Sequence, residues 1–229
     1  MPSALITGGS SGIGLAIGKM LRDEGFAVTL ASRTAEKVEA AAAELGAHAI
    51  AADVSREEDC ARVVAEHVAR EGGLDVLVNS AGIGIAGRVE DAQVKHIDRQ
   101  IGINVRGLIL VTQAALPHLR EAKGWIVNLA SIAGTQPVAI LPVYAATKAA
   151  VISLTHSLNA DLDDDGVRSI AICPGFVDTP MAEFAGIPGE EMIQPEDCAE
   201  VVRMCLRLSP RARIPQVVIE RVGSSSRIG

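Results

Sequence analysis

Short aliphatic segments alternate with longer alanine-rich segments along this chain. We interpret the aliphatic segments as seven β-strands, at residues 3–7, 26–32, 48–52, 74–80, 125–131, 168–173 and 215–220. The segments between them are typical of helices, at residues 12–24, 35–45, 56–71, 91–120, 142–163 and 195–208. Helices of this length between consecutive strands require crossover connections, and such connections produce a parallel sheet.

Several predicted strands are apolar throughout instead of alternating, which indicates helices on both faces of the sheet. A chain of 229 residues fits one large α/β domain, and it contains no internal repeat or linker. We therefore predict a single Rossmann-like domain over residues 1–229, doubly wound around a seven-stranded parallel sheet. Gly46, Gly72 and Gly166 mark helix ends, and Ser55 with Glu58 forms a capping-box pattern.

Charge and cysteine usage disfavour several classes of protein. The net charge of -7, without a Lys/Arg stripe, argues against a nucleic-acid partner and favours small molecules. The four cysteines show no CxxC spacing and the histidines stand singly, so we expect reduced thiols and no metal site. The first strand leaves no room for a signal segment, and the longest apolar stretch, 108–116, is too short to span a membrane. We expect a cytoplasmic protein.

A glycine-rich loop follows the first predicted strand. TGGSSGIG at residues 7–14 places Gly8, Gly12 and Gly14 between a strand and a helix. Glycines there allow a tight turn, expose the backbone to a pyrophosphate and let the helix approach closely. The surrounding strand and helix provide the context that a dinucleotide site requires, although a purely structural turn is the alternative.

The end of the second predicted strand bears on the choice of cofactor. An enzyme that uses NAD places an acidic residue there, against the ribose 2′-hydroxyl. This chain has Ser32 and Arg33 instead. A guanidinium can hold the 2′-phosphate of NADP, so we favour NADP, with NAD as the alternative cofactor and a surface Arg as the alternative role.

A Tyr and a Lys lie four residues apart in YAATK, residues 144–148. In a helix, positions i and i+4 lie on the same face, so Tyr144 and Lys148 point the same way. Alone, this pair also fits an ordinary amphipathic helix whose Tyr packs at the edge of the core while its Lys extends to water.

These motifs and others, in order, resemble the classical short-chain dehydrogenase/reductase family over nearly the whole chain. TGGSSGIG is similar to the family's cofactor loop, residues 53–54 to its adenine contact, and NSAG at 79–82 to its NNAG motif, with Ser80 as a departure. INVRG, VNLASIAG, YAATK and PGFVDTPM then follow in the family's order and spacing. Ser131 precedes Tyr144 by 13 residues, as the family's catalytic pair usually does.

The resemblance implies a catalytic set of Asn104, Ser131, Tyr144 and Lys148. A carbonyl that accepts hydride develops negative charge on its oxygen, so Ser131 would hold that oxygen and Tyr144 would protonate it. A free Tyr has a pKa of about 10, and the Lys148 cation would favour its ionised form in the reverse reaction. The family also implies that Lys148 holds the nicotinamide ribose and that Asn104 anchors a water in a proton relay. As alternatives, Ser131 caps a turn and Asn104 satisfies helix backbone.

The resemblance also implies a set of cofactor contacts from the glycine loop, the strand ends and the PG turn. This set is Gly8, Ser10, Ser11, Gly12, Ile13, Gly14, Ser32, Arg33, Asp53, Val54, Asn79, Ala81, Gly82, Tyr144, Lys148, Pro174, Gly175, Val177 and Thr179. Asp53 would accept a hydrogen bond from the adenine amino group, with helix N-capping as the alternative. Thr179 resembles the family's contact to the nicotinamide carboxamide.

The substrate residues implied are mostly apolar, with a short lid at about 181–194. They are Ile83, Ser131, Gln136, Val138, Ile140, Met181 and Phe184, and they fit acyl thioesters, steroids, quinones and small ketones alike. We therefore hypothesise an NADP(H)-dependent oxidoreductase that interconverts a carbonyl and a secondary alcohol, with an NADPH-binding sensor of little turnover as the alternative. The resemblance also implies a homodimer or homotetramer, with the helices near 91–120 and 142–163 between subunits.

Overall fold

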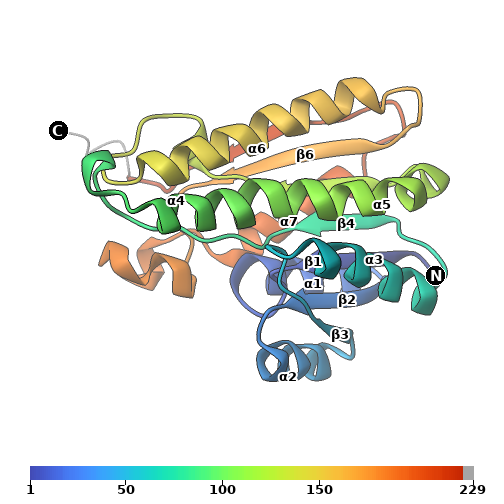
Figure 1. The fold of residues 1–229 in the computed structure, drawn as a ribbon. Coiled ribbons are helices and arrows are strands. Elements are labelled where there is room, and N and C mark those ends of the chain that lie inside the picture. Colours follow the sequence, from blue (N-terminus) through green and yellow to red (C-terminus); the bar gives the residue numbers. More distant parts are fainter. Residues whose placement is uncertain (224–229) are drawn as a thin grey trace.

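Seven parallel strands form one sheet in the computed structural model, which describes residues 1–223 (Figure 1). The strands are β1 Ser3–Thr7, β2 Ala27–Ser32, β3 His48–Ala51, β4 Val76–Asn79, β5 Trp125–Leu129, β6 Arg168–Pro174 and β7 Gln216–Ile219. They lie in the order β3-β2-β1-β4-β5-β6-β7, and each neighbouring pair is parallel. The predicted doubly wound sheet is confirmed.

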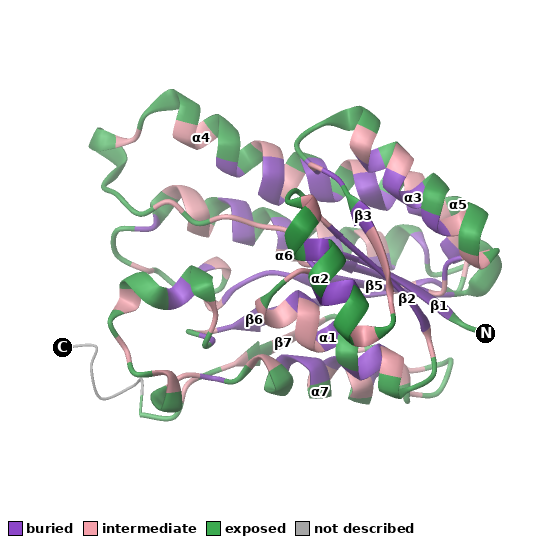
Figure 2. Ribbon diagram, turned by 90° about the horizontal axis from the view of Figure 1, so that it is seen from below, coloured by how far each residue is buried: buried purple, intermediate pink, exposed green. Residues whose placement is uncertain are grey.

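Alternate residues of each strand face two separate helical layers. Ile6 and Leu30 pack against α1 Gly12–Asp23, α2 Ala35–Leu45 and α7 Pro195–Leu206. Leu5 and Leu77 face the opposite way, against α3 Glu57–Glu71 and α5 Leu108–Ala122. Helix α6, Pro142–Asp161, extends this second layer over β6 through Val151. Figure 2 shows the buried strands between α1 and α7 on one side and α3 and α5 on the other. Helices on both faces explain why the strands are apolar at successive positions.

The strand order reverses between β1 and β4. Strands β2 and β3 lie on one side of β1, whereas β4 and all later strands lie on the other. In open α/β sheets, ligands bind beyond the carboxyl ends of the strands at such a switch point. The glycine loop follows β1 at this position, and NSAG begins at the last residue of β4.

The helix predicted at 91–120 is interrupted. Helix α4 covers Val94–Ile101, a π-helical segment covers Gly102–Gly107, and α5 then runs to Ala122. Gly107 lies so close to the loop between β3 and α3 that a Cβ on it would be 2.4 Å from the Val54 carbonyl oxygen. Short π-helical insertions often mark functional positions, and this one contains Asn104.

The helix ends confirm some local predictions and correct one. Gly46 and Gly72 adopt left-handed conformations at the C-termini of α2 and α3, as the sequence predicts. The predicted capping box at Ser55 and Glu58 is wrong, because α3 begins after Arg56 and has no side-chain cap. The Ser55 hydroxyl instead donates to Asp53 at 2.8 Å.

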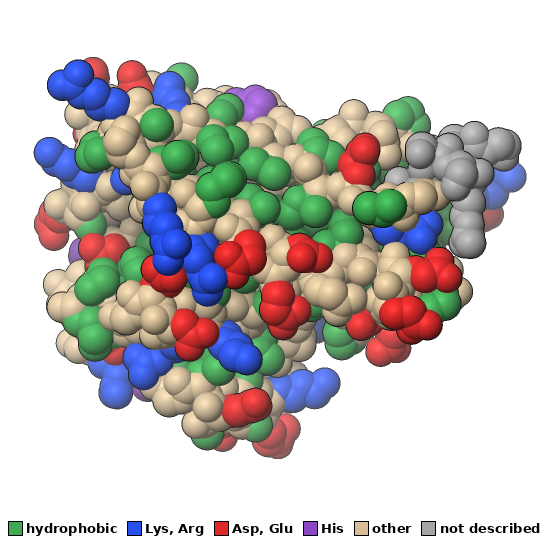
Figure 3. All heavy atoms as spheres, turned by 180° about the vertical axis from the view of Figure 1, so that it is seen from behind, with side chains coloured by type: hydrophobic (Ala, Val, Ile, Leu, Met, Phe, Trp, Pro, Cys, Tyr) green, Lys and Arg blue, Asp and Glu red, His purple; other side chains and the backbone are tan. Residues whose placement is uncertain are grey.

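Several titratable side chains are buried as structural groups. His67 contacts the hydroxyl groups of Thr29 and Ser3 at 2.8 and 3.2 Å, and burial lowers its pKa to about 4. The four cysteines are free and buried, and burial raises the pKa of each thiol. Within residues 1–223 there is no cluster of His, Cys, Asp and Glu that could hold a metal ion, and no helix that could cross a membrane. Figure 3 shows acidic and basic side chains interspersed on one face.

Candidate active site

A groove follows the carboxyl ends of β1, β2 and β4. Many residues of the predicted cofactor set line it: Gly8, Ser10, Ser11, Gly12, Ile13, Ser32, Arg33, Asp53, Val54, Ala81, Gly82 and Thr179. Ile83, which we expected to contact substrate, also lies here. The sequence motifs therefore converge on one elongated surface.

The glycine loop has a conformation that larger residues would prevent. Gly8 and Gly12 have φ angles of +68° and +53°. A Cβ on Gly14 would lie 2.5 Å from the Gly8 carbonyl oxygen, so this glycine lets the loop and helix meet. Ser11 precedes α1 without a side-chain cap, which leaves the N–H groups of the first turn free of that partner. Such a helix N-terminus attracts a phosphate through its N–H groups and its dipole.

The end of β2 places two cations and one unpaired hydroxyl beside the groove. Arg33 is exposed, and Lys37, in the first turn of α2, lines the same surface. The Ser32 hydroxyl is buried and has no hydrogen-bond partner. Since buried polar groups usually have partners, this hydroxyl suits a ligand group. Sequence reasoning overlooked Lys37, although a cation one helical turn after the strand end could have signalled it.

Asp53 sits in a turn before α3. Its carboxylate accepts hydrogen bonds from the Ser55 backbone at 2.9 Å and from the Ser55 hydroxyl. The residue that precedes α3 is Arg56, so the alternative that Asp53 is the helix N-cap is wrong. Contact with adenine stays a prediction for this carboxylate, which lines the groove.

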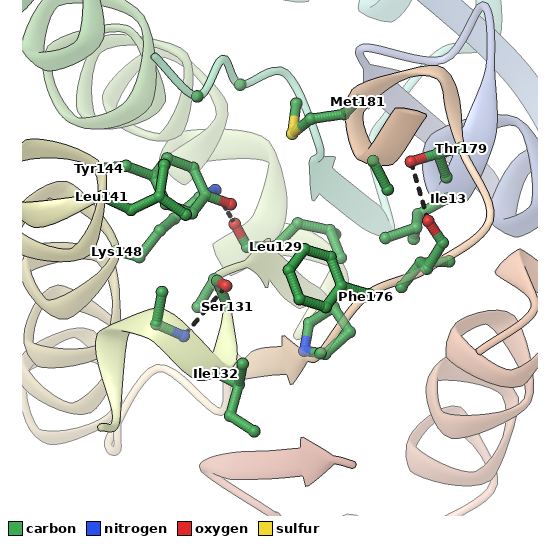
Figure 4. A pocket seen from close by; sticks show the side chains of 18 of the residues that line it. Ile13, Leu129, Ser131, Ile132, Leu141, Tyr144, Lys148, Phe176, Thr179 and Met181 are labelled. Carbon is green, nitrogen blue, oxygen red and sulfur yellow. Dashed lines mark hydrogen bonds between the residues drawn. The ribbon is translucent and has the colours of Figure 1, made fainter. Parts of the chain in front are cut away.

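Ser131, Tyr144 and Lys148 line one cavity, which joins the groove at Ile13, Gly82 and Thr179 (Figure 4). Ser131 lies just beyond β5, and its hydroxyl accepts a hydrogen bond from the Ala133 backbone at 3.1 Å. The turn-capping alternative for Ser131 is thus observed. It leaves the hydroxyl hydrogen available, since a hydroxyl both donates and accepts.

Lys148 is buried behind Tyr144. Its Nζ donates to the Leu129 carbonyl oxygen at 2.6 Å and lies 5.7 Å from the centre of the Tyr144 ring. The amphipathic-helix alternative required this side chain to extend to water. It does not, so that alternative is wrong. Burial lowers the pKa of Lys148 to about 8, so the amine keeps its proton at neutral pH.

Burial raises the pKa of the Tyr144 phenol, and a hydrogen bond with Ser131 lowers it to a smaller extent. The pKa of Tyr144 is therefore raised, whereas the Lys148 cation was expected to lower it. Because burial in a low-dielectric environment disfavours a phenolate, the neutral form prevails. A neutral phenol at this position is suited to donate a proton.

Asn104 connects the π-helical segment to the loop after β4 and to α6. Its Oδ1 accepts from the Ile83 N–H at 2.9 Å, and its Nδ2 donates to the Ile83 carbonyl at 2.8 Å. The same Nδ2 donates to Thr147 at 3.0 Å, and Thr147 donates to the Tyr144 carbonyl at 2.7 Å. The proposed alternative, in which Asn104 satisfies helix backbone, is therefore wrong, because its backbone partner is a loop residue.

Gly134, which sequence reasoning overlooked, lets α6 approach the short helix at Ile132–Gly134 closely, whereas Gly84 is in ordinary contact with the Tyr144 ring. A Cβ on Gly134 would lie 2.7 Å from the Lys148 carbonyl carbon. A Cβ on Gly84 would lie 3.5 Å from the Tyr144 ring. Gly134 lies three residues after Ser131, in SIAG, and before Tyr144. A glycine between these two catalytic candidates could have indicated a close contact there.

Asn79, a member of the predicted cofactor set, lies outside the groove lining. Its side chain is buried and donates to Thr112 at 3.0 Å and to Asn128 at 2.9 Å. Asn128 in turn donates to Thr155 of α6 at 2.9 Å. The Asn79 side chain thus belongs to a polar network that joins β4 and β5 to the helices, and it does not line the groove.

The predicted substrate residues separate into two groups. Val138, Met181 and Phe184 line the cavity with Ser131, whereas Gln136 and Ile140 do not. Gln136 and Ile140 are exposed, on either side of Val138, in the irregular chain that follows the short helix at Ile132–Gly134. Pro174, Gly175 and Val177, predicted as cofactor contacts, line this cavity, together with Phe176 and Leu141, which we did not predict.

The predicted lid begins and ends at one parallel bridge. Val177 pairs with Ile193, and the Asp178 N–H donates to the Ile193 carbonyl at 2.9 Å. Between them the chain forms two short 3₁₀ helices, Pro180–Ala185 and Gly189–Glu191. The segment is therefore fixed at its base, and its function as a lid stays a prediction.

Known proteins match this chain along most of its length. A family model described as short chain dehydrogenase matches residues 2–186. An uncharacterized oxidoreductase of Staphylococcus epidermidis is 36% identical over 225 residues, which cover 96% of each chain. A second uncharacterized oxidoreductase, from Staphylococcus aureus, is 34% identical over 223 residues, again 96% of each. The chain belongs to the short-chain dehydrogenase family and is an oxidoreductase of that family.

Solved structures agree in fold. An alcohol dehydrogenase from the archaeon Thermococcus sibiricus, complexed with 5-hydroxy-NADP, has a TM-score of 0.90 and 30% identity over 97% of both chains. A 3-ketoacyl-(acyl-carrier-protein) reductase from Brucella melitensis, complexed with NADH, has a TM-score of 0.90 and 32% identity over 96% of both chains. A nicotinamide cofactor is therefore supported for this family fold, and the two neighbours differ in which one they hold.

Proposed function

We propose that this protein reduces a carbonyl compound to a secondary alcohol with NADPH, and that Tyr144 is the general acid. The observation that carries the proposal is the convergence of Ser131, Tyr144 and Lys148 on one cavity that joins the groove of the glycine loop. The same residues would catalyse the reverse oxidation.

The residues of the groove suit a dinucleotide phosphate. The glycine loop and the first turn of α1 would hold the pyrophosphate, and Asp53 would accept from the adenine amino group. Arg33 and Lys37 would pair with a 2′-phosphate, while the unpaired Ser32 hydroxyl would donate to it. An acidic residue at the end of β2 would repel that phosphate, and none is present there. NAD is the alternative cofactor.

Each catalytic side chain at the cavity would have a separate role in the reduction. A reduced nicotinamide, when bound, would supply the hydride that the carbonyl carbon accepts. The Ser131 hydroxyl donates to the carbonyl oxygen as negative charge develops, and Tyr144 transfers its phenolic proton to that oxygen. Burial keeps the Tyr144 phenol protonated, so it carries the proton that the oxygen needs. Lys148 stabilises the phenolate left behind and would hold the nicotinamide ribose hydroxyls. By family resemblance, Asn104 would anchor a water that returns a proton through Lys148.

The proposed cofactor preference predicts that NADPH binds more tightly than NADH. Replacing Arg33 with Ala should weaken NADPH binding about 10- to 100-fold, because a charge-assisted hydrogen bond is lost, and should change NADH binding little. Fluorescence titration measures both dissociation constants. Arg70→Ala, which removes an exposed guanidinium at the far end of α3, is the matched control. Equal or reversed dissociation constants for the two cofactors in the unaltered protein would defeat the NADP assignment.

We also propose a cytoplasmic homodimer or homotetramer that contacts small molecules. Val94, Ile101 and Ile109 are exposed apolar side chains on α4 and α5, the region expected between subunits. The outer part of α6 exposes the small residues Ala146, Ala149 and Ala150, which would allow close approach of a second helix. Light scattering that detects only a monomer would contradict this assembly.

A further inference from the structure

The cavity beyond Ser131 and Tyr144 is apolar. Its walls come from Val138 and Leu141 before α6, from Phe176 after β6, and from Met181, Ala182 and Phe184 in the lid segment. Of the described residues that line the cavity, five carry polar side chains: Ser80, Ser131, Tyr144, Lys148 and Thr179. Ser80 and Thr179 also line the cofactor groove. The part of the cavity that faces the lid therefore has no charged side chain.

Lys148 is the one cation among these lining residues, and its place makes it unsuitable for a substrate carboxylate. The residue is 6% exposed, and its Nζ donates to the Leu129 carbonyl behind the Tyr144 ring. A carboxylate next to the reacting carbonyl would lose water without gaining a charged partner. Such a transfer is strongly unfavourable.

Aromatic side chains are concentrated in this cavity. The chain has three Phe, one Tyr and one Trp, and three of these five residues, Tyr144, Phe176 and Phe184, line it. The Phe176 and Phe184 rings meet edge to face, with centroids 6.3 Å apart and an interplanar angle of 69°. Yet Phe176 is 37% and Phe184 59% exposed, so both keep ring surface available for another flat apolar group.

We propose that the substrate is a neutral ketone with a flat apolar group, such as an aryl ring, on one side of its carbonyl. The ring would pack on Phe176 and Phe184, and the enzyme would discriminate against a carboxylate next to the carbonyl. This inference rests on the proposed function, because it uses Ser131 and Tyr144 as the contacts of the carbonyl oxygen.

Four related carbonyl compounds test the substrate class with NADPH: methyl benzoylformate, benzoylformate, methyl pyruvate and pyruvate. We expect kcat/KM for methyl benzoylformate to exceed that for benzoylformate by about 100-fold, because only the acid brings an unpaired charge. The kcat/KM for methyl benzoylformate should also exceed the kcat/KM for methyl pyruvate by about 10-fold, because the aryl ring adds contacts with the Phe rings. Acids reduced as well as their esters would overturn the proposal.

Two substitutions at Phe184 separate the contribution of the ring from that of charge. Phe184→Leu should keep the preference for ester over acid and reduce the preference for aryl over methyl by about 3- to 10-fold. Phe184→Arg should reduce the preference for ester over acid at least 10-fold, because it supplies the missing cation. Each variant is compared with the unaltered protein on the same compounds, so differences in the intrinsic reactivity of the compounds cancel from the change in each ratio. Unchanged ratios in both variants would overturn the proposal.

Binding to the Tyr144→Phe variant separates this inference from the proposed function. In the presence of NADPH, calorimetric titration should show methyl benzoylformate binding at least 10-fold more tightly than benzoylformate. Tighter binding of the ester without any reduction by the unaltered protein would contradict the proposed function and support the substrate class. Equal binding, or tighter binding of the acid, would overturn the substrate class whatever the turnover.

Discussion

Replacing Tyr144 with Phe should lower kcat by about 1,000-fold while the dissociation constant of NADPH changes less than about 3-fold. The substitution removes one oxygen and keeps the ring, which packs close to Gly84. Since Ser131 can still donate to the carbonyl oxygen, the missing function is proton transfer alone. Stopped-flow absorbance at 340 nm measures the rate of NADPH oxidation.

The control for this prediction is Ser131→Ala, which removes the other hydroxyl at the cavity. It should also lower kcat, but it leaves the proton donor in place. A Tyr144→Phe variant that retains more than about a tenth of the original rate would exclude Tyr144 as the acid, because general acid catalysis contributes at least about 100-fold.

Replacing Lys148 with Met should reduce both turnover and cofactor binding. We expect kcat/KM to fall about 1,000-fold and the NADPH dissociation constant to rise about 10-fold, because one cation would serve both Tyr144 and the ribose hydroxyls. Isothermal titration and steady-state rates measure the two effects. The joint loss distinguishes Lys148 from Tyr144, for which binding should persist.

Stability must be followed in the Lys148 variant, since the substitution leaves the Leu129 carbonyl without its donor. A buried unpaired carbonyl costs about 1–3 kcal/mol, which thermal unfolding detects. Lys19→Met, at an exposed position in α1, is the matched control and should leave turnover, NADPH binding and thermal stability unchanged. Unaltered NADPH binding in folded Lys148→Met would contradict the proposed ribose contact.

The sequence predicts most of the sheet because local patterns determine it. Strands such as β1 and β5 are short aliphatic runs between helices, and the glycine loop needs only a strand before it and a helix after it. Boundaries were less accurate, as for β4, predicted at 74–80 and observed at Val76–Asn79. Leu74 is buried although it precedes the strand, so apolarity alone extended the prediction.

Features that depend on distant contacts were not predictable. The π-helical segment around Asn104 is joined to Ile83 and Thr147, which lie 21 and 43 residues away. Asn79 lies in a motif that resembles a cofactor contact, yet its partners Thr112 and Asn128 keep its side chain inside the protein. Likewise Phe176 lines the cavity and Gln136 does not, because the path of a loop determines which side chains reach a cavity.

Transfer of deuterium from NADPH to substrate tests the central claim most directly. The protein is incubated with NADPH that carries deuterium at C4 in either stereochemical position, together with methyl benzoylformate, and the alcohol is analysed by mass spectrometry. Direct hydride transfer predicts an alcohol one mass unit heavier from one of the two labelled cofactors and an unlabelled alcohol from the other. An alcohol that carries deuterium from neither labelled cofactor would contradict the proposed reduction.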